Sequence, residues 1–248
     1  MLFCLASSTA YLINDLFDSK QDREHPIKSL RPLASGKLER GQAIIIALSL
    51  GALTCVLSLS LNITLFLILA IYILLNFLYS IWLKHILFID VLCLAAFFTL
   101  RLLAGSYAIH ISLSPWIFVL VILQVLFFSF NKRLQELRTL GKRASEHRFV
   151  LASYNDHLID QIMLIITILT LFIYPFYTID ADTIQKIGNA HMLLTIPFFY
   201  FGILRYLYLL RKWQKEEDPA RIIFSDLFMQ VDLFLLILTI MGVIYFAI

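Results

Sequence analysis

The sequence predicts an all-α fold, a polytopic bundle of about eight transmembrane helices. Two observations carry this prediction. The 248 residues are 60% hydrophobic and have a mean hydropathy of +0.86, whereas soluble domains are about 45–50% apolar. Apolar stretches long enough to cross about 30 Å of hydrocarbon also recur along the whole chain. We therefore expect one transmembrane domain over residues 1–248, and no soluble domain beside it.

Each apolar stretch gives one predicted helix, and Gly, Pro or Asn marks several of the ends, as at Gly41, Asn62 and Pro115. The predicted helices lie near residues 1–18, 41–60, 63–83, 87–109, 115–135, 158–178, 190–211 and 226–248. The first resembles a signal peptide in its apolar character. It lacks a basic region before it and runs into acidic residues without a cleavage signature, so we interpret it as the end of a helix.

The basic residues predict how the helices are oriented. Most of the 20 Lys and Arg lie in the loops 19–40, 132–157 and 212–225, and Lys84 lies in a short turn. If the helices alternate in direction, these four segments fall on one side of the membrane, and the opposite loops carry only Lys186. Cytoplasmic loops are enriched in Lys and Arg. We therefore expect a multi-pass protein of a bacterial or archaeal cytoplasmic membrane, with the charged loops in the cytosol.

An acidic segment at the end of the first predicted helix carries the strongest chemical signal. On a helix, Asn14, Asp18 and Asp22 share one face, and Asp15 lies beside it. Clustered carboxylates repel one another, and Mg²⁺ relieves this repulsion with one or two carboxylates, water and phosphate oxygens as ligands. The alternative is an acidic helix end that water alone solvates.

Cations follow this acidic segment directly. Arg31 offers a guanidinium that binds phosphate through two hydrogen bonds, and Lys28 offers a compact charge. Carboxylates that hold a metal beside such cations are suited to a diphosphate. Each cation is also explained by the positive-inside rule alone, and His25 either contacts phosphate or stabilises the turn.

The motifs resemble the UbiA superfamily of intramembrane prenyltransferases. Residues 14–22 read NDLFDSKQD and residues 31–36 read RPLASG, similar to the family's NDxxDxxxD followed by RPxxxG. A second acidic motif, DxxxD, is expected in a later cytosolic loop. Asp156 and Asp160 stand at this spacing within residues 154–160, YNDHLID.

Further segments resemble one branch of that superfamily, the decaprenyl-phosphate phosphoribosyltransferases. Residues 25–32 read HPIKSLRP, where members acting on aromatic acceptors have RTxxRP. The segments YSIWLKH (79–85), LRLLAG (100–105) and KRLQEL (132–137) are also similar to that branch. The resemblance implies transfer of 5-phosphoribose from phosphoribosyl diphosphate to a polyprenyl phosphate of the decaprenyl type. It also implies nine helices, and this sequence begins within the second, so we expect the first to be absent from it.

The resemblance and the residue chemistry together give a set of expected site residues. Mg²⁺ is expected on Asn14, Asp15, Asp18, Asp22, Asp156 and Asp160, of which Asp15, Asp18 and Asp22 are the expected catalytic residues. Substrate contacts are expected from His25, Lys28, Arg31, Tyr79, Lys84, Arg101, Lys132, Arg133 and Tyr154. An ionised phosphate acceptor needs no general base, which agrees with the lack of an obvious His or Cys nucleophile.

Several of these residues have simpler explanations. Arg101 lies inside an apolar helix, where a charge is costly, and it either lines a polar cavity or pairs with an acid within the membrane. Tyr79 is also explained as an aromatic anchor at the membrane interface. Lys132 and Arg133 are also explained as charges that set the topology.

Two other functions remain open from the sequence. The first is a prenyltransferase that moves a prenyl chain from prenyl diphosphate to an aromatic acceptor, and HPIKSLRP argues against it. The second is a transporter, which requires charges near the middle of the membrane, whereas most acids here lie at helix ends. The expected partners are phosphoribosyl diphosphate, a polyprenyl phosphate and the membrane. Nucleic acid is not expected, and a homo-oligomer is left open.

Overall fold

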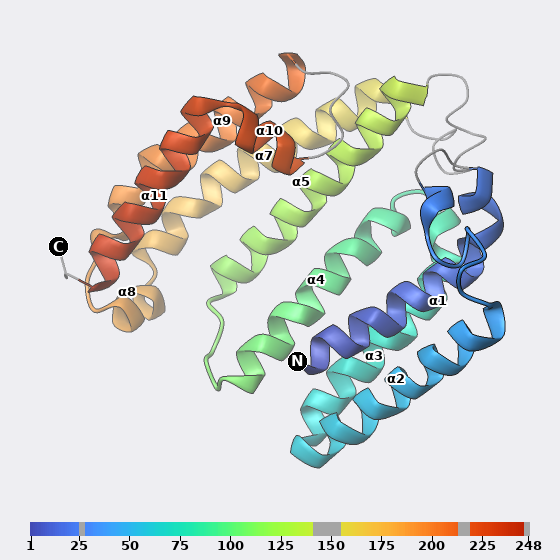
Figure 1. The fold of residues 1–248 in the computed structure, drawn as a ribbon. Coiled ribbons are helices and arrows are strands. Elements are labelled where there is room, and N and C mark those ends of the chain that lie inside the picture. The colour runs from blue at the N-terminus through green and yellow to red at the C-terminus, as the bar shows by residue number, and fades with distance from the viewer. Residues whose placement is uncertain (25–27, 141–154, 213–218, 246–248) are drawn as a thin grey trace. The chain divides into compact units, whose positions relative to one another are not determined.

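The computed structural model describes residues 1–24, 28–140, 155–212 and 219–245 (Figure 1). Within these ranges the chain forms ten α-helices and three short 3-10 turns, and no β-strand. Seven of the helical segments are long and apolar enough to cross a membrane. The predicted class, an all-α transmembrane bundle, is therefore confirmed, and the chain is a multi-pass membrane protein.

The described residues divide into two compact units. Unit 1 covers Met1–Ser112, and unit 2 begins at Leu113. The prediction of one domain over the whole chain stays a prediction. Unit 1 consists of α1 (Leu2–Glu24), η1 (Lys28–Leu30), α2 (Arg40–Leu61), α3 (Ile63–Ile81), η2 (Leu83–His85) and α4 (Ile89–Ala108). In this unit α1 packs against α2 and α3, and α3 also packs against α2 and α4.

Small residues let the helices of unit 1 approach one another. Ala6 and Ala10 of α1 lie in one buried cluster with Leu69 and Tyr72 of α3 and Ala104 of α4. An alanine has no side chain beyond Cβ, so two helix backbones can come close, as they do in other membrane bundles. This packing holds α1 against α3 along the segment that leads to the acidic residues.

Unit 2 contains the remaining helices. They are α5 (Pro115–Leu140), α7 (Asp156–Ile179), α8 (Ala181–Ile187), η5 (His191–Thr195), α9 (Ile196–Lys212), α10 (Pro219–Ser225) and α11 (Leu227–Tyr245). Here α5 packs along α7, and α9 packs against α7 and α11. The stacked rings of Tyr174 and Phe199, whose centroids lie 3.7 Å apart, join α7 to α9.

All eight predicted helices form, but α1 is not among the seven segments that are long and apolar enough to span a membrane. Three further features differ from the prediction. The first helix continues to Glu24 instead of ending at residue 18, because no Gly or Pro interrupts the sequence before Pro26. The short helices α8 and α10 form in segments predicted as loops. The predicted helix 190–211 begins with the 3-10 turn η5 before α9.

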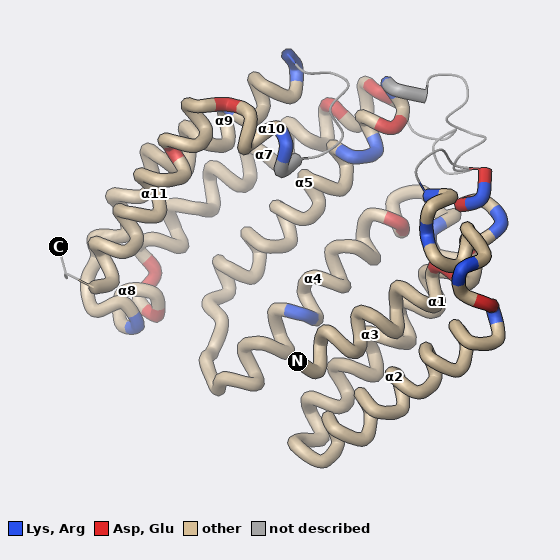
Figure 2. Tube along the Cα trace, in the orientation of Figure 1, with Lys and Arg blue, Asp and Glu red and all other residues tan. Residues whose placement is uncertain are grey.

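Charged residues gather at the ends of the helices in both units (Figure 2). In unit 1 they lie around the end of α1 and the start of α2, and α4 carries Asp90 in its first turn and Arg101 farther along. In unit 2 the end of α5 and the start of α7 carry charges, and α8 carries Asp182 and Lys186 near the other end of α7. Which end faces the cytosol stays a prediction.

Candidate functional site

The last three turns of α1 present three carboxylates to the rest of unit 1. Because α1 is helical through Glu24, Asp15, Asp18 and Asp22 extend from one continuous surface of the helix, as the spacing predicts. Their side chains are 24%, 22% and 7% exposed. Carboxylates that are this withdrawn from water require cationic partners.

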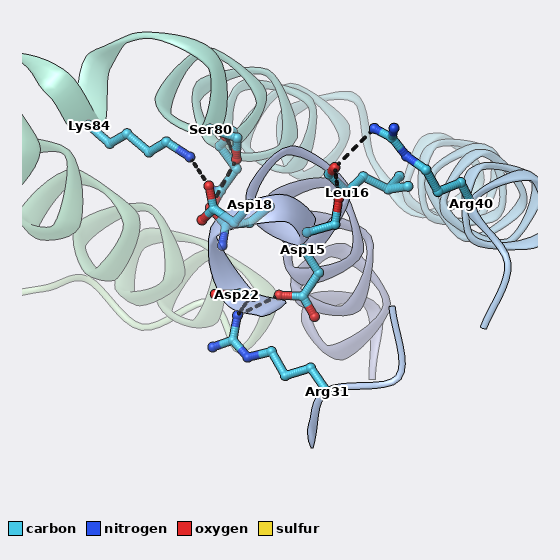
Figure 3. A network of polar contacts seen from close by, with 11 residues as sticks. Asp15, Leu16, Asp18, Asp22, Arg31, Arg40, Ser80 and Lys84 are labelled. Carbon is cyan, nitrogen blue, oxygen red and sulfur yellow. Dashed lines mark hydrogen bonds and ion pairs between the residues drawn. The ribbon is translucent and has the colours of Figure 1, made fainter. Parts of the chain in front are cut away.

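Arg31 supplies the partner for two of these carboxylates. Its Nη1 lies 2.8 Å from an oxygen of Asp15 and 2.8 Å from an oxygen of Asp22 (Figure 3). The two carboxylates therefore converge on a single point in space. Arg31 follows Asp22 by nine positions in the sequence, and the fold places its guanidinium beside the acidic side chains, as predicted.

The loop that carries Arg31 is shaped by local contacts. The turn η1 ends where the Arg31 amide donates to the Lys28 carbonyl at 3.0 Å, and the side chain of Leu33 is buried. Gly36 follows with φ +78°, a left-handed conformation that favours glycine. The chain can then turn into α2, so the RPLASG segment fixes the position of the guanidinium.

Lys84 supplies the partner for the third carboxylate. Its Nζ forms an ion pair with Asp18, and the Lys84 side chain is only 11% exposed. Lys84 lies in η2, directly after α3, so the packing of α3 against α1 brings it to the acidic helix end. Nearby, Asn14 accepts a hydrogen bond of 3.5 Å from the hydroxyl of Ser80 on α3.

Several charged groups lie close together at this site, and they shift the pKa of Asp15. Burial raises the pKa of Asp15 above its ordinary value, Arg31 opposes the rise, and Asp22 and Asp18 add to it. A nearby positive charge favours the ionised carboxylate. Removing Arg31 without supplying another cation would therefore push Asp15 towards its protonated form.

The donor set around Arg31 fits a magnesium ion. Mg²⁺ takes oxygen ligands, binds one or two carboxylates, and completes its shell with water and phosphate oxygens. Asp15 and Asp22 already direct one oxygen each towards a common point. In the described part of the chain, no three His, Cys, Asp or Glu side chains meet as a closed metal cage.

The second predicted acidic pair lies in unit 2 and is more open. Asp156 and Asp160 occupy the first turns of α7, each with a side chain 54% exposed. Both face Arg138 of α5, at 3.8 Å for Asp156 and 2.9 Å for Asp160. The side chain of Asn155 caps α7 by accepting from the His157 amide at 3.0 Å. The pair therefore has the spacing that the sequence predicts and a cation that the prediction missed.

Two other predicted contact residues of unit 1 make different contacts. The ring of Tyr79 packs edge-on against Phe97 of α4, with centroids 5.5 Å apart. Arg101 donates to the Ser7 hydroxyl at 2.8 Å and stacks over the ring of Phe3 at 5.2 Å. Ser7 is about 16 Å along α1 from Asp18 at 1.5 Å per residue. Arg101 is thus at the other end of α1, and its role towards a substrate stays a prediction.

The remaining predicted residues lie in three places. Lys28 begins η1, beside the end of α1. On α5, Lys132 is exposed, whereas Arg133 is 2% exposed and forms an ion pair of 2.9 Å with Glu136. His25 and Tyr154 fall outside the described residues. The metal and substrate roles assigned to the whole set stay predictions.

Two buried amides on α5 were missed by the sequence reasoning. Asn131 and Gln135 stand four residues apart and are 1% and 0% exposed. The available signal was a pair of polar side chains at helical spacing, of which Asn131 directly precedes KRLQEL and Gln135 lies within it. Both side chains line a pocket in unit 2.

Comparisons with known proteins agree with the fold and the motifs. A model of the UbiA prenyltransferase family matches residues 1–231. The decaprenyl-phosphate phosphoribosyltransferase of Mycolicibacterium smegmatis is 29% identical over 253 residues, which cover all of this chain and 79% of that protein. The enzyme of that name from Corynebacterium glutamicum is 30% identical over 208 residues, covering 83% of this chain and 63% of its own.

A solved structure shows the same fold. The UbiA homolog from Archaeoglobus fulgidus bound to GPP and Mg²⁺ superposes with a TM-score of 0.73 at 19% identity. The match covers 98% of this chain and 85% of the other.

Proposed function

Because the chain belongs to the UbiA prenyltransferase family, a family of membrane transferases, we propose that it transfers 5-phosphoribose from phosphoribosyl diphosphate to a polyprenyl phosphate. Diphosphate is the second product. The observation that carries the proposal is the acidic end of α1, where Asp15, Asp18 and Asp22 lie against Arg31 and Lys84. Curated relatives at 29–30% identity bear the name of this activity, which supports the choice of donor and acceptor.

In this proposal, the acidic end of α1 binds the diphosphate through a metal ion and two cations. Asn14, Asp15, Asp18 and Asp22 at the end of α1 would hold Mg²⁺. Bound there, the metal would neutralise charge on the diphosphate oxygens. Carboxylates engaged by a metal no longer neutralise Arg31 and Lys84, so these two cations become available to phosphate oxygens.

The reaction exchanges one C–O bond for another. The bond between ribose C1 and the diphosphate oxygen breaks, and its electron pair leaves with the diphosphate. A phosphate oxygen of the lipid acceptor bonds to C1 from the opposite face. Arg31 and Lys84 stabilise the negative charge that develops on the leaving group. The acceptor oxygen is already ionised, so no side chain has to remove a proton.

The membrane context supports a lipid acceptor. Seven helical segments of the described chain can span a bilayer, and the acidic residues lie at the end of α1, where charged residues of unit 1 gather. A polyprenyl phosphate has its charged group at the membrane surface and its chain in the hydrocarbon. We propose that the reaction takes place at the cytosolic surface of the cytoplasmic membrane.

The proposal is tested with the full chain purified in detergent, Mg²⁺, labelled phosphoribosyl diphosphate and a polyprenyl phosphate. Transfer of label into the lipid phase is expected, and chelation of the metal should stop it. Asp18→Asn keeps a hydrogen-bonding partner for Lys84 but removes the charge, and should lower the rate by about 100-fold or more.

Asp182→Asn is the matched control, because Asp182 is an exposed aspartate of α8. It should retain the wild-type rate. Equal loss in both variants, or no labelled lipid from the wild type, would contradict the proposal. Prenylation of 4-hydroxybenzoate from a prenyl diphosphate by the same preparation would instead assign the aromatic branch of the family.

A further inference from the structure

A small pocket inside unit 2 contains unpaired polar groups that the acidic sites do not explain. It has a volume of about 50 Å³ and lies between α5, α7 and α9. Asn131 and Gln135 of α5 line it, together with Arg138, Asp160 and Arg211. One water molecule needs about 15 Å³ of such volume, so the pocket has room for roughly three water-sized groups.

The two amides are what make this pocket unusual. Asn131 is 1% exposed and Gln135 is 0% exposed. Among the described residues, neither the amide nitrogen nor the amide oxygen of either side chain has a hydrogen-bond partner. Buried polar atoms are paired in the great majority of structures, because an unpaired group loses its bonds to water. Four such atoms around one pocket therefore call for an occupant.

The chemistry of the four atoms restricts that occupant. Each amide offers a donor nitrogen and an acceptor oxygen, so a full partner must both donate and accept. Hydroxyl groups do both, whereas a phosphate dianion only accepts and a prenyl chain does neither. Of the two arginines in the lining, Arg138 is paired with Asp160 at 2.9 Å, and Arg211 is exposed.

We propose that this pocket binds a pair of neighbouring hydroxyl groups of a sugar. The assignment of that sugar to the ribose of phosphoribosyl diphosphate rests on the proposed function, but the hydroxyl-binding character of the pocket does not. Asp160 lines the pocket and belongs to the second acidic motif, so the hydroxyl site adjoins residues that are predicted to bind Mg²⁺. An apolar prenyl group would leave the amides unpaired, so the pocket selects for a ribosyl donor over a prenyl donor.

The test measures hydroxyl recognition directly, by calorimetric titration of the full chain in detergent with Mg²⁺. Ribose 5-phosphate is compared with 2,3-dideoxyribose 5-phosphate, which lacks both hydroxyls. The wild type should prefer the ribose form by on the order of 100-fold. Gln135→Met and Asn131→Leu preserve side-chain size and remove the amide, and each should reduce this preference to below about 10-fold.

Gln124→Met is the matched control, because it makes the same substitution on the same helix outside this pocket. It should keep the wild-type preference. An unchanged preference in Gln135→Met and Asn131→Leu, or a wild type with no preference, would show that water alone fills the pocket and would overturn the proposal. Thermal unfolding of each variant in the same buffer confirms that the protein is folded.

The two proposals fail in different ways. If the wild type transfers no phosphoribose but still prefers ribose 5-phosphate through Gln135, the proposed reaction is wrong and the hydroxyl pocket stands. If transfer occurs and the variants keep the preference, the pocket is wrong and the reaction stands.

Discussion

The acidic motifs of the two units differ in the exposure of their carboxylates and in the cations that pair with them. In unit 1, Asp15, Asp18 and Asp22 are clustered, largely withdrawn from water, and matched by Arg31 and Lys84. In unit 2, Asp156 and Asp160 are 54% exposed and share Arg138. Electrostatic interactions strengthen as water is excluded. The comparison indicates that the ion pairs of the α1 carboxylates are stronger than those of the α7 pair.

The largest expected effect tests this contrast through the two arginines. Arg31→Met leaves Asp15 and the 7% exposed Asp22 without a cation, and should lower the free energy of unfolding by about 3 kcal/mol. Arg138→Met removes a partner from two exposed carboxylates, and should cost less than about 1 kcal/mol. Reversible unfolding in mixed micelles measures both values.

That experiment uses EDTA throughout, so that no metal replaces the missing guanidinium. Equal losses in the two variants would contradict this difference in strength between the two sets of ion pairs.

A second prediction concerns a carboxylate that lies close to the backbone of a neighbouring helix. Asp232 of α11 is 7% exposed, and a Cβ added to Gly202 of α9 would lie 2.8 Å from its Oδ2. Gly202→Ala must therefore displace Asp232, and should cost about 1–2 kcal/mol of unfolding free energy. Gly105 of α4 has no atom within 4 Å of an added Cβ, so Gly105→Ala should stabilise by about 0.5–1 kcal/mol.

The two variants distinguish the steric effect of contact with Asp232 from the intrinsic preference of a helix for alanine over glycine. In an Asp232→Ala background the cost of Gly202→Ala should largely disappear, as a double-mutant cycle shows. A cost that persists there would mean that another contact of α9 sets the requirement for glycine.

The smallest expected effect is a pH dependence in unit 2. Arg205 donates two hydrogen bonds to Asp226, at 2.7 and 3.2 Å, and these hydrogen bonds lower the pKa of Asp226 below its ordinary value. A lowered pKa stabilises the fold above the ordinary value of about 4, and this contribution is lost as the pH falls through the folded-state pKa.

Arg205→Gln should therefore lower the midpoint temperature of unfolding at pH 7. At pH 3 the midpoint temperatures of the variant and the wild type should lie closer together. Parallel midpoint curves for the two proteins between these pH values would show that the ion pair does not contribute.

Much of the fold could be predicted because its signals are local. A span of about 20 apolar residues becomes a helix in a bilayer whatever its neighbours are, since every backbone polar group must then be paired internally. The helical period, which is also a local property, places Asp15, Asp18 and Asp22 on one surface of α1. The end of α1 was misplaced because the sequence reasoning stopped the helix where the apolar run stops, at residue 18. The polar continuation to Glu24 has no helix breaker.

The sequence by itself determined the membrane class, the order of the helices and the acidic surface of α1, because these follow from composition and from a period of 3.6 residues. Only the tertiary structure decided which cation meets which acid. Lys84 is 66 residues from Asp18, and their ion pair depends on the packing of α3 against α1. The pocket of Asn131 and Gln135 likewise exists only where α5, α7 and α9 meet. The local sequence pattern determines where helices form and which residues share a helix face. Packing between segments that are distant in the sequence determines which side chains come into contact.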